Sequence, residues 1–116
     1  IIFHRKELPE HTLEKTAAAF VNKPTVIVEA NHGGSLPAEG SYFHLQAESA
    51  VLTVVKHCEE ENGVIVRIAE YDGKDQKGIL TAGKNDYPII ISPYEIKTLK
   101  LTPDQCMEVN MLEQAE

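Results

Sequence analysis

Acidic side chains are the first candidates for chemistry in this sequence, because two carboxylates that converge can act as a general acid and a general base. The candidates are Glu29, Glu39, Glu48, Glu70 and Glu95. They lie in the middle or at the ends of apolar, strand-like stretches, and no local motif pairs any two of them. The sequence therefore predicts no catalytic residue, and only the fold decides whether two carboxylates converge.

Metal-binding and nucleophilic motifs are the next kind of chemistry to consider. The five histidines are His4, His11, His32, His44 and His57. None forms an HxH or HxxxH pair, so we expect no dedicated metal site. Cys58 and Cys106 lie far apart and in no CxxC pattern, and we expect both to be buried and reduced rather than joined in a disulfide. No nucleophile elbow, zincin motif or calcium loop occurs.

The longest loop, residues 31–40, contains two side chains that are candidates for contacting a ligand, His32 and Glu39. Its three glycines and its proline are equally typical of an ordinary solvated loop, which is the alternative interpretation. The loop is not a phosphate-binding loop, because no Gly-Lys-Ser/Thr follows and no strand-to-helix pattern surrounds it.

Composition and charge indicate one globular domain. The 116 residues suffice for a single core, so we predict one domain over residues 1–116. Acidic residues number 18 against 11 basic ones, and the net charge of −7 argues against nucleic acid or an anionic membrane as partner. No apolar run is long enough to span a bilayer, and the first three residues do not begin a signal peptide. We expect a cytoplasmic protein, and the missing initiator Met suggests a fragment of a longer chain.

The clearest structural pattern is a pair of apolar runs rich in β-branched residues, residues 50–55 and 64–69. The polar stretch between them ends in Asn-Gly, a strong hairpin signal, so we predict two long antiparallel strands joined by a tight turn. Alternation along the second run places Arg67 on a mostly apolar face. A guanidinium there needs a carboxylate or carbonyl partner, and we expect it to reach the sheet edge with Glu70 nearby.

Residues 9–22 are predicted to form a lead-in helix. Pro9 suits a first helical turn, and Pro24 forbids continuation of the helix. Apolar residues recur at helical spacing and form one stripe: Leu13, Ala17, Phe20 and Val21. The alternative is an amphipathic helix that docks a partner or a membrane, although its polar face is not basic.

The remaining chain is typical of short strands separated by turns. The expected strands are residues 25–30, 41–46, 78–81, 88–91, 94–101 and 107–112. Pro88 and Pro93 confine the strand between them to an edge or a bend, and the mixed faces of residues 94–101 place that strand near an edge. Together these elements predict an all-β fold, an antiparallel two-sheet β-sandwich of immunoglobulin-like size with one short N-terminal helix.

Three stretches, taken in this order and spacing, resemble a known family. The first stretch is Phe20-Val21-Asn22-Lys23-Pro24, followed by Gly34-Ser35-Leu36-Pro37 and Ser41-Tyr42-Phe43. The second is Val51-Leu52-Thr53-Val54-Val55-Lys56, followed by Val66-Arg67-Ile68-Ala69-Glu70. The third is Ser92-Pro93-Tyr94-Glu95-Ile96-Lys97-Thr98-Leu99. About residues 9–101 resemble the C-terminal β-sandwich region of glycoside hydrolase family 38 α-mannosidases. Residues 109–113 resemble a strand that precedes the third stretch in that family and follows it here.

The resemblance implies a part of a larger enzyme. In that family a zinc ion, held by aspartates and histidines, lies in an N-terminal domain with a carboxylate nucleophile, and α-mannosides are hydrolysed with retention. None of those motifs occurs here, so we expect no catalytic residue, cofactor or metal ligand in this chain, and zinc only in the parent's catalytic domain. Four residues match family positions: Lys56, Arg67, Glu70 and Glu95. We expect them to form a structural framework of ion pairs and strand-end hydrogen bonds.

The resulting hypothesis is a non-catalytic C-terminal accessory domain that packs against the catalytic and central domains of a parent α-mannosidase and stabilises them. The parent's substrate would be a mannose-containing oligosaccharide, and a homo-oligomer is compatible with such an assembly. An accessory domain of this kind is expected to expose an apolar patch where the rest of the enzyme belongs.

Two alternatives are open. An independent carbohydrate-binding module would need a sugar platform, although the sequence has no Trp and the platform would consist of Tyr42, Tyr71, Tyr87 and Tyr94. An independent protein-interaction module would bind another chain through an unpaired sheet edge, which the two edge prolines would oppose.

Overall fold

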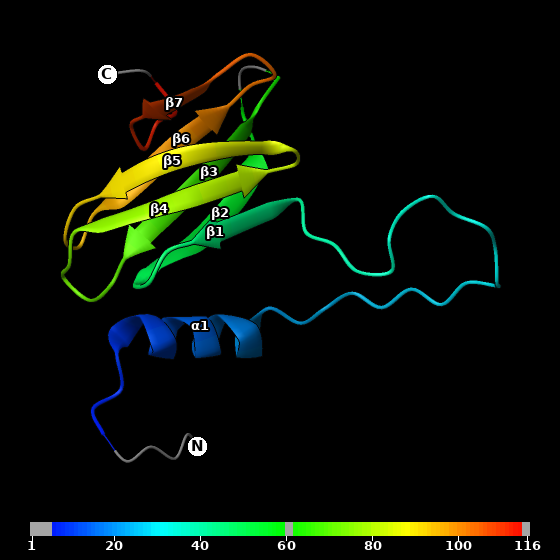
Figure 1. Ribbon diagram of the computed structural model, residues 1–116, viewed down its shortest axis with the longest axis horizontal. Helices are drawn as coiled ribbons and strands as arrows, with labels where there is room; N and C mark the ends of the chain where they lie inside the picture. Colours follow the sequence, from blue (N-terminus) through cyan, green and yellow to red (C-terminus); the bar gives the residue numbers. More distant parts are fainter. Residues whose placement is uncertain (1–5, 60–61, 115–116) are drawn as a thin grey trace.

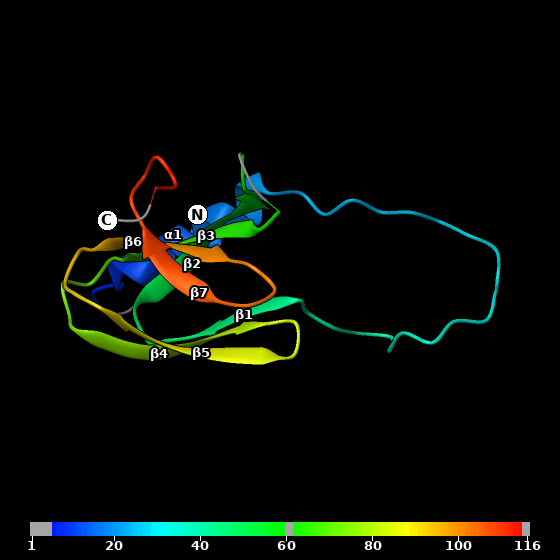
Figure 2. The same cartoon turned by 90° about the horizontal axis from the view of Figure 1, so that it is seen from above.

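Two antiparallel β-sheets face one another in the computed structural model, which describes residues 6–59 and 62–114 (Figure 1). Sheet A has the strand order β1-β4-β5, and sheet B has the order β2-β3-β6-β7. The strands are β1 (Phe43–Gln46), β2 (Ala50–His57), β3 (Val64–Glu70), β4 (Gln76–Ala82), β5 (Asn85–Ile91), β6 (Ile96–Leu101) and β7 (Cys106–Val109). Figure 2 shows the sheets as two layers, and the predicted all-β sandwich is confirmed.

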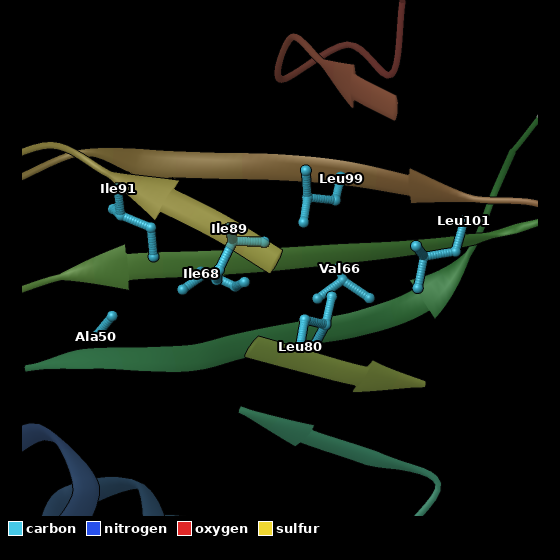
Figure 3. Close-up of a cluster of buried hydrophobic side chains, with 8 residues drawn as sticks. All are labelled: Ala50, Val66, Ile68, Leu80, Ile89, Ile91, Leu99 and Leu101. Atoms are coloured by element: carbon cyan, nitrogen blue, oxygen red, sulfur yellow. The ribbon is translucent and has the colours of Figure 1, made fainter. Parts of the chain in front are cut away.

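The core fills the space between the layers, where apolar side chains of both sheets meet (Figure 3). It is built from Ala50, Val66, Ile68, Leu80, Ile89, Ile91, Leu99 and Leu101. Side chains of a strand alternate between its two faces, so every second residue of these strands points into the core. The β-branched and leucine side chains that the sequence places there suit such a pleated, buried surface.

The connections between strands are divided between the two ends of the sandwich (Figure 1). Hairpins join β2 to β3, β4 to β5 and β6 to β7 at one end, which we call the hairpin end. The connections from β1 to β2, β3 to β4 and β5 to β6 pass from one sheet to the other at the opposite end, which we call the crossover end. The two layers are therefore linked by chain at the crossover end alone.

The predicted central hairpin is confirmed. β2 and β3 pair antiparallel along their length, with a register shift between Leu52 and Val54. Residues 60–61 of the predicted turn lie outside the described residues. β5 is an edge strand, as Pro88 predicts, because it pairs with β4 alone in sheet A. It begins at Asn85, earlier than expected, because the β4–β5 turn is shorter than the sequence suggested.

The prediction that residues 94–101 lie near an edge agrees with the topology, although β6 is not the edge strand itself. β6 lies between β3 and β7, and β7 is the edge of sheet B. The mixed pattern of β6 arises because polar residues on its outer face are buried. Thr98 and Lys100 are 3% and 8% exposed, whereas Ile96 at the start of the strand is 60% exposed. Leu99 and Leu101 face the core, while Thr98 on the outer face donates a hydrogen bond from Oγ1 to Sδ of Met111 (3.7 Å) in the C-terminal turn.

The prediction of a strand at residues 25–30 is also wrong. Residues 23–42 are exposed throughout and run outward from the sandwich and back again (Figures 1 and 2). A strand needs a neighbour that pairs with its backbone N–H and C=O groups. The described part of the chain places no such neighbour beside residues 25–30, whereas residues 31–40 form the predicted loop.

Helix α1 (Glu10–Val21) forms within residues 9–22, where the lead-in helix is predicted, and Pro9 and Asn22 are its N-cap and C-cap residues. It lies alongside β2 (Figure 1), yet none of its residues is buried and Phe20 is 85% exposed. The apolar stripe therefore meets the sandwich over only part of its length. Within the described residues no helix has the length and apolar character needed to cross a bilayer.

Leu80→Ala tests the core assignment. Leu80 is fully buried between the sheets, so we expect the free energy of unfolding in urea to fall by about 2–5 kcal/mol from lost burial and the cavity left behind. The control is Ile90→Ala, because Ile90 lies on the neighbouring strand and is 66% exposed. That change should cost less than about 0.5 kcal/mol. Equal losses in the two variants would contradict the described core.

Candidate functional site

Glu70 ends β3 at the crossover end, and hydrogen bonds from all three crossovers converge on its carboxylate. The residue is 3% exposed. Its Oε1 accepts from Oγ of Ser49 (2.6 Å) and from the N–H of Asp72 (2.9 Å). Its Oε2 accepts from the N–H groups of Gly73 (2.8 Å) and Tyr94 (2.9 Å). Ser49, the Asp72–Gly73 pair and Tyr94 belong to three different crossovers, so this one side chain fixes how the connecting segments lie together.

These hydrogen bonds keep Glu70 ionised. Burial by itself raises the pKa of a carboxyl group, but the bonds from Ser49 and from the three N–H groups outweigh it and lower the pKa of Glu70 to about 2. A carboxylate with this pKa holds no proton to donate at neutral pH, and both of its oxygens already accept hydrogen bonds. Glu70 is therefore suited to organising structure and unsuited to acid–base catalysis.

Two residues with left-handed backbone lie against one another beside this carboxylate. Tyr94 has φ +58° and Gly73 has φ +71°. A Cβ placed on Gly73 would lie 2.6 Å from Cζ of Tyr94, so the ring rests directly on the glycine backbone. The hydrogen bonds from both N–H groups to Glu70 hold this arrangement, and they offset the cost of a non-glycine residue at positive φ.

Asp72 extends the network to α1. Its Oδ1 accepts from the N–H of His11 (3.1 Å), and its Oδ2 lies 2.7 Å from Nδ1 of the same residue. The cap residue of α1 is Pro9, whose side chain makes no capping hydrogen bond. Asp72 supplies from a distant segment the acceptor and negative charge that a helix N-terminus favours. Burial raises the pKa of Asp72, but the hydrogen bonds from His11 outweigh burial and lower it.

Glu95 contributes a second carboxylate at the crossover end. Its Oε2 accepts from the N–H of Ser92 (2.6 Å), and its Oε1 pairs with Nζ of Lys97 (2.8 Å), which also reaches Glu108 (2.8 Å). Its backbone carbonyl accepts from the N–H of Glu70 (3.0 Å). Burial raises the pKa of Glu95, while Lys97 and Ser92 together lower it below its usual value. Glu70 and Glu95 are thus neighbours whose carboxylates have separate partners.

Lys56 pairs with two carboxylates near the hairpin end. Its Nζ contacts Glu113 of the C-terminal turn and Glu59 (3.0 Å). Glu113 also accepts from the N–H of Glu59 (3.1 Å) and from Sγ of Cys58 (3.4 Å). The bond from Lys56, followed by that from Glu59, lowers the pKa of Glu113 to about 2. Glu113, to which the sequence analysis gave no role, thus joins the C-terminal turn to the end of β2.

Arg67 reaches the same turn from β3. Its Nη2 donates to the carbonyl of Met111 (3.1 Å), which confirms that the guanidinium takes a carboxylate or carbonyl partner. The expectation that Glu70 lies nearby as its companion is wrong, since the two residues project from opposite faces of the strand. Nε of Arg67 is buried and has no hydrogen-bond partner among the described residues. Lys56, Arg67, Glu70 and Glu95 thus make the contacts expected of framework residues, and that role itself stays a prediction.

The other candidate residues do not assemble into a catalytic or metal site. His32 pairs with Glu29 (3.1 Å) on the exposed segment rather than with Glu39. The N–H of Glu48, not its carboxylate, bonds to Gln76 (3.2 Å). No group of three or more His, Cys, Asp and Glu side chains within residues 6–59 and 62–114 is placed to hold a metal ion. The two cysteines are free and half-buried rather than fully buried as expected.

A concave site that sequence reasoning missed opens at the hairpin end, between the two sheets. It is a pocket of about 310 Å³, and the lining includes Phe43, His57, Asn62, Tyr87 and Pro103. These side chains come from four hairpin or strand ends, which no sequence pattern connects. Of the other tyrosines named as a sugar platform, Tyr71 and Tyr94 are at the crossover end, and Tyr42 precedes β1 at the hairpin end without being among the pocket's lining residues. The four tyrosines therefore do not form one platform.

Glu70→Gln tests the carboxylate network. The amide nitrogen would replace one carboxylate oxygen and face at least one backbone N–H, which can only donate, so we expect a loss of about 2–4 kcal/mol in the free energy of unfolding at pH 7. The folded pKa of about 2 lies below the ordinary value of 4.5. The native chain should therefore lose stability as pH falls from about 4.5 to 2, by on the order of 3 kcal/mol at about 1.4 kcal/mol per pKa unit.

Urea unfolding of both proteins between pH 7 and pH 2 measures these effects. The variant should lack the part of the acid dependence that Glu70 contributes. Glu48→Gln is the control, because Glu48 is exposed and its carboxylate has no role in the network. An unchanged unfolding free energy and an unchanged acid slope in Glu70→Gln would contradict the network.

Gly73→Ala, compared with Gly83→Ala, tests the contact with Tyr94. Both glycines have positive φ, but only Gly73 lies against a ring, and nothing is within 4 Å of a Cβ at Gly83. Backbone strain should cost each variant about 1 kcal/mol, and displacement of the ring should cost Gly73→Ala about 1 kcal/mol more. In a Tyr94→Ala background the two substitutions should cost the same. Thermal unfolding of the six proteins measures this, and a difference that persists without the ring would refute the contact.

Comparison with known families identifies the sandwich. A sequence model described as "Glycosyl hydrolases family 38 C-terminal beta sandwich domain" matches residues 49–116. The matched region covers β2 to β7 and includes all of the residues that donate to Glu70. No curated protein and no solved structure matches the chain significantly. Since the match spans more than half of the sequence and its description agrees with the two-sheet fold, the chain belongs to the family of glycosyl hydrolase family 38 C-terminal β-sandwich domains.

Proposed function

We propose that this chain is a non-catalytic accessory domain of a zinc-dependent α-mannosidase, which packs against the catalytic and central parts of its parent polypeptide and stabilises them. The family match over residues 49–116 carries the proposal. The hydrogen bonds that occupy Glu70 and the dispersal of the other carboxylates support a structural role. We assign no zinc ligand to this chain, and the metal ion would act as a Lewis acid in the parent's catalytic domain.

Exposed apolar side chains support a packing role. Phe20 and Val21 at the end of α1 and the segment Val26 to Val28 are exposed, and Ile90 is exposed on the outer face of sheet A. Apolar surface of this extent is typical of proteins that bury it against a partner. An independent carbohydrate-binding module is less well supported, because the four tyrosines are divided between the two ends of the sandwich.

The size and activity of the natural polypeptide test the proposal. An antiserum raised against the 116-residue chain should detect, in an immunoblot of the source cells, a polypeptide several times longer than this chain. That polypeptide should co-purify with an α-mannosidase activity that a chelator removes and zinc restores. A polypeptide of only 116 residues, or a longer one that lacks the activity after purification and zinc addition, would contradict the proposal.

A further inference from the structure

Residues 23–42, which we call the arm, leave the sandwich after α1 and return to it at β1 (Figures 1 and 2). Every arm residue is exposed. The arm follows α1, whose first turn bonds to Asp72, and it leads into β1, which pairs with β4. The arm is therefore a projection between two elements of the fold, and it lies outside the matched region, which begins at residue 49.

The centre of the arm has the chemistry of a strand without a partner. Val26, Ile27 and Val28 are three successive β-branched residues that are 79%, 77% and 90% exposed. Successive side chains of an extended chain point to opposite faces, so both faces of this segment are apolar. Strands with two apolar faces are found where a sheet is covered on both sides. Within the described residues, no backbone hydrogen bond links residues 25–30 to another segment.

The apolar surface on and beside the arm is large enough for a stable interface. Seven apolar side chains are between 71% and 90% exposed: Phe20, Val21, Val26, Ile27, Val28, Leu36 and Tyr42. Together they can supply surface on the order of the roughly 800 Å² per partner that a standard interface buries. Charges are sparse, because the arm carries only Lys23, Glu29 and Glu39 in a chain of net charge −7. Little desolvation of charge therefore opposes its burial.

The sheet edges of this chain are poor acceptors for a further strand, so a second copy is not the best partner. β1 and β7 are edge strands of four residues each. β5 has Pro88 in its middle, and α1 lies alongside β2. Short edges, proline and a covering helix are features that oppose pairing with another strand. The partner is instead a sheet edge that another domain provides.

We propose that residues 25–30 add as a strand to an exposed β-sheet edge in another domain of the parent enzyme, with the flanking apolar side chains packed beneath it. The proposal rests on the proposed function, because it names the surface by which the accessory domain docks. Pairing would satisfy the N–H and C=O groups of the arm, and the two-faced apolar strand would be covered on both sides.

Hydrogen exchange read by mass spectrometry tests this pairing in the natural full-length polypeptide and in the 116-residue chain. The amides of residues 25–30 should exchange on the order of 100-fold more slowly in the full-length protein and rapidly in the chain alone. Fast exchange in both proteins would overturn the proposal. Slow exchange in the chain alone that strengthens with protein concentration would also overturn it, and would make a second copy the partner.

Matched lysine substitutions in the full-length polypeptide test whether the slow exchange of residues 25–30 depends on the side chains of the arm. Ile27→Lys should restore fast exchange over residues 25–30, whereas Ile96→Lys, the same change at a 60% exposed position of sheet B to which no docking role is given, should leave these amides protected. Protection that survives Ile27→Lys would overturn the proposal. Chelator-sensitive α-mannosidase activity of the same preparation separates the two claims. An active enzyme with a rapidly exchanging arm refutes the docking strand alone, whereas a polypeptide without that activity refutes the accessory function as well.

Discussion

Four hydrogen bonds converge on the buried carboxylate of Glu70, and they come from all three segments that cross between the sheets. A buried charge is tolerated only where its hydrogen-bonding capacity is met, so the crossovers must hold one relative arrangement for the charge to be satisfied. The same side chain positions Asp72, which in turn caps α1 through His11. Helix, crossovers and sheets are thereby joined through a single anion.

Local signals in the sequence were sufficient for the elements that depend on neighbouring residues. The β2–β3 hairpin follows from two β-branched runs around Asn-Gly, and the edge position of β5 follows from Pro88. The partners of Glu70 could not be predicted, because Ser49 and Tyr94 lie 21 and 24 residues away and no periodic pattern links them. The carbonyl partner of Arg67 comes from a turn 44 residues further on. Distance along the chain, rather than any unusual chemistry, limited the prediction of the site.

The strand assignments that pattern alone could not settle have two physical causes. Residues 94–101 have mixed faces because Thr98, which bonds to Met111 of the C-terminal turn, is a buried polar residue on the outer face, and alternation alone cannot distinguish a buried polar residue from one at an exposed edge. Residues 25–30 have strand propensity but no neighbour in this chain, and propensity without a partner does not make a strand. β1 shows the converse case: β4 supplies a partner for residues 43–46, and they form a strand of sheet A although they lie outside the matched family region.

The division of the sandwich into a hairpin end and a crossover end also decides where its conformational entropy is lost. Each hairpin closes a short loop within one sheet, whereas the bond from Tyr94 to Glu70 closes a span of 24 residues that leaves sheet B, forms β4 and β5 and returns. Closing a loop of that length costs roughly 3 kcal/mol in chain entropy, and the cost grows only slowly with length. The entropic cost of joining the two layers is therefore concentrated at the crossover end, where the hydrogen bonds to a single carboxylate oppose it.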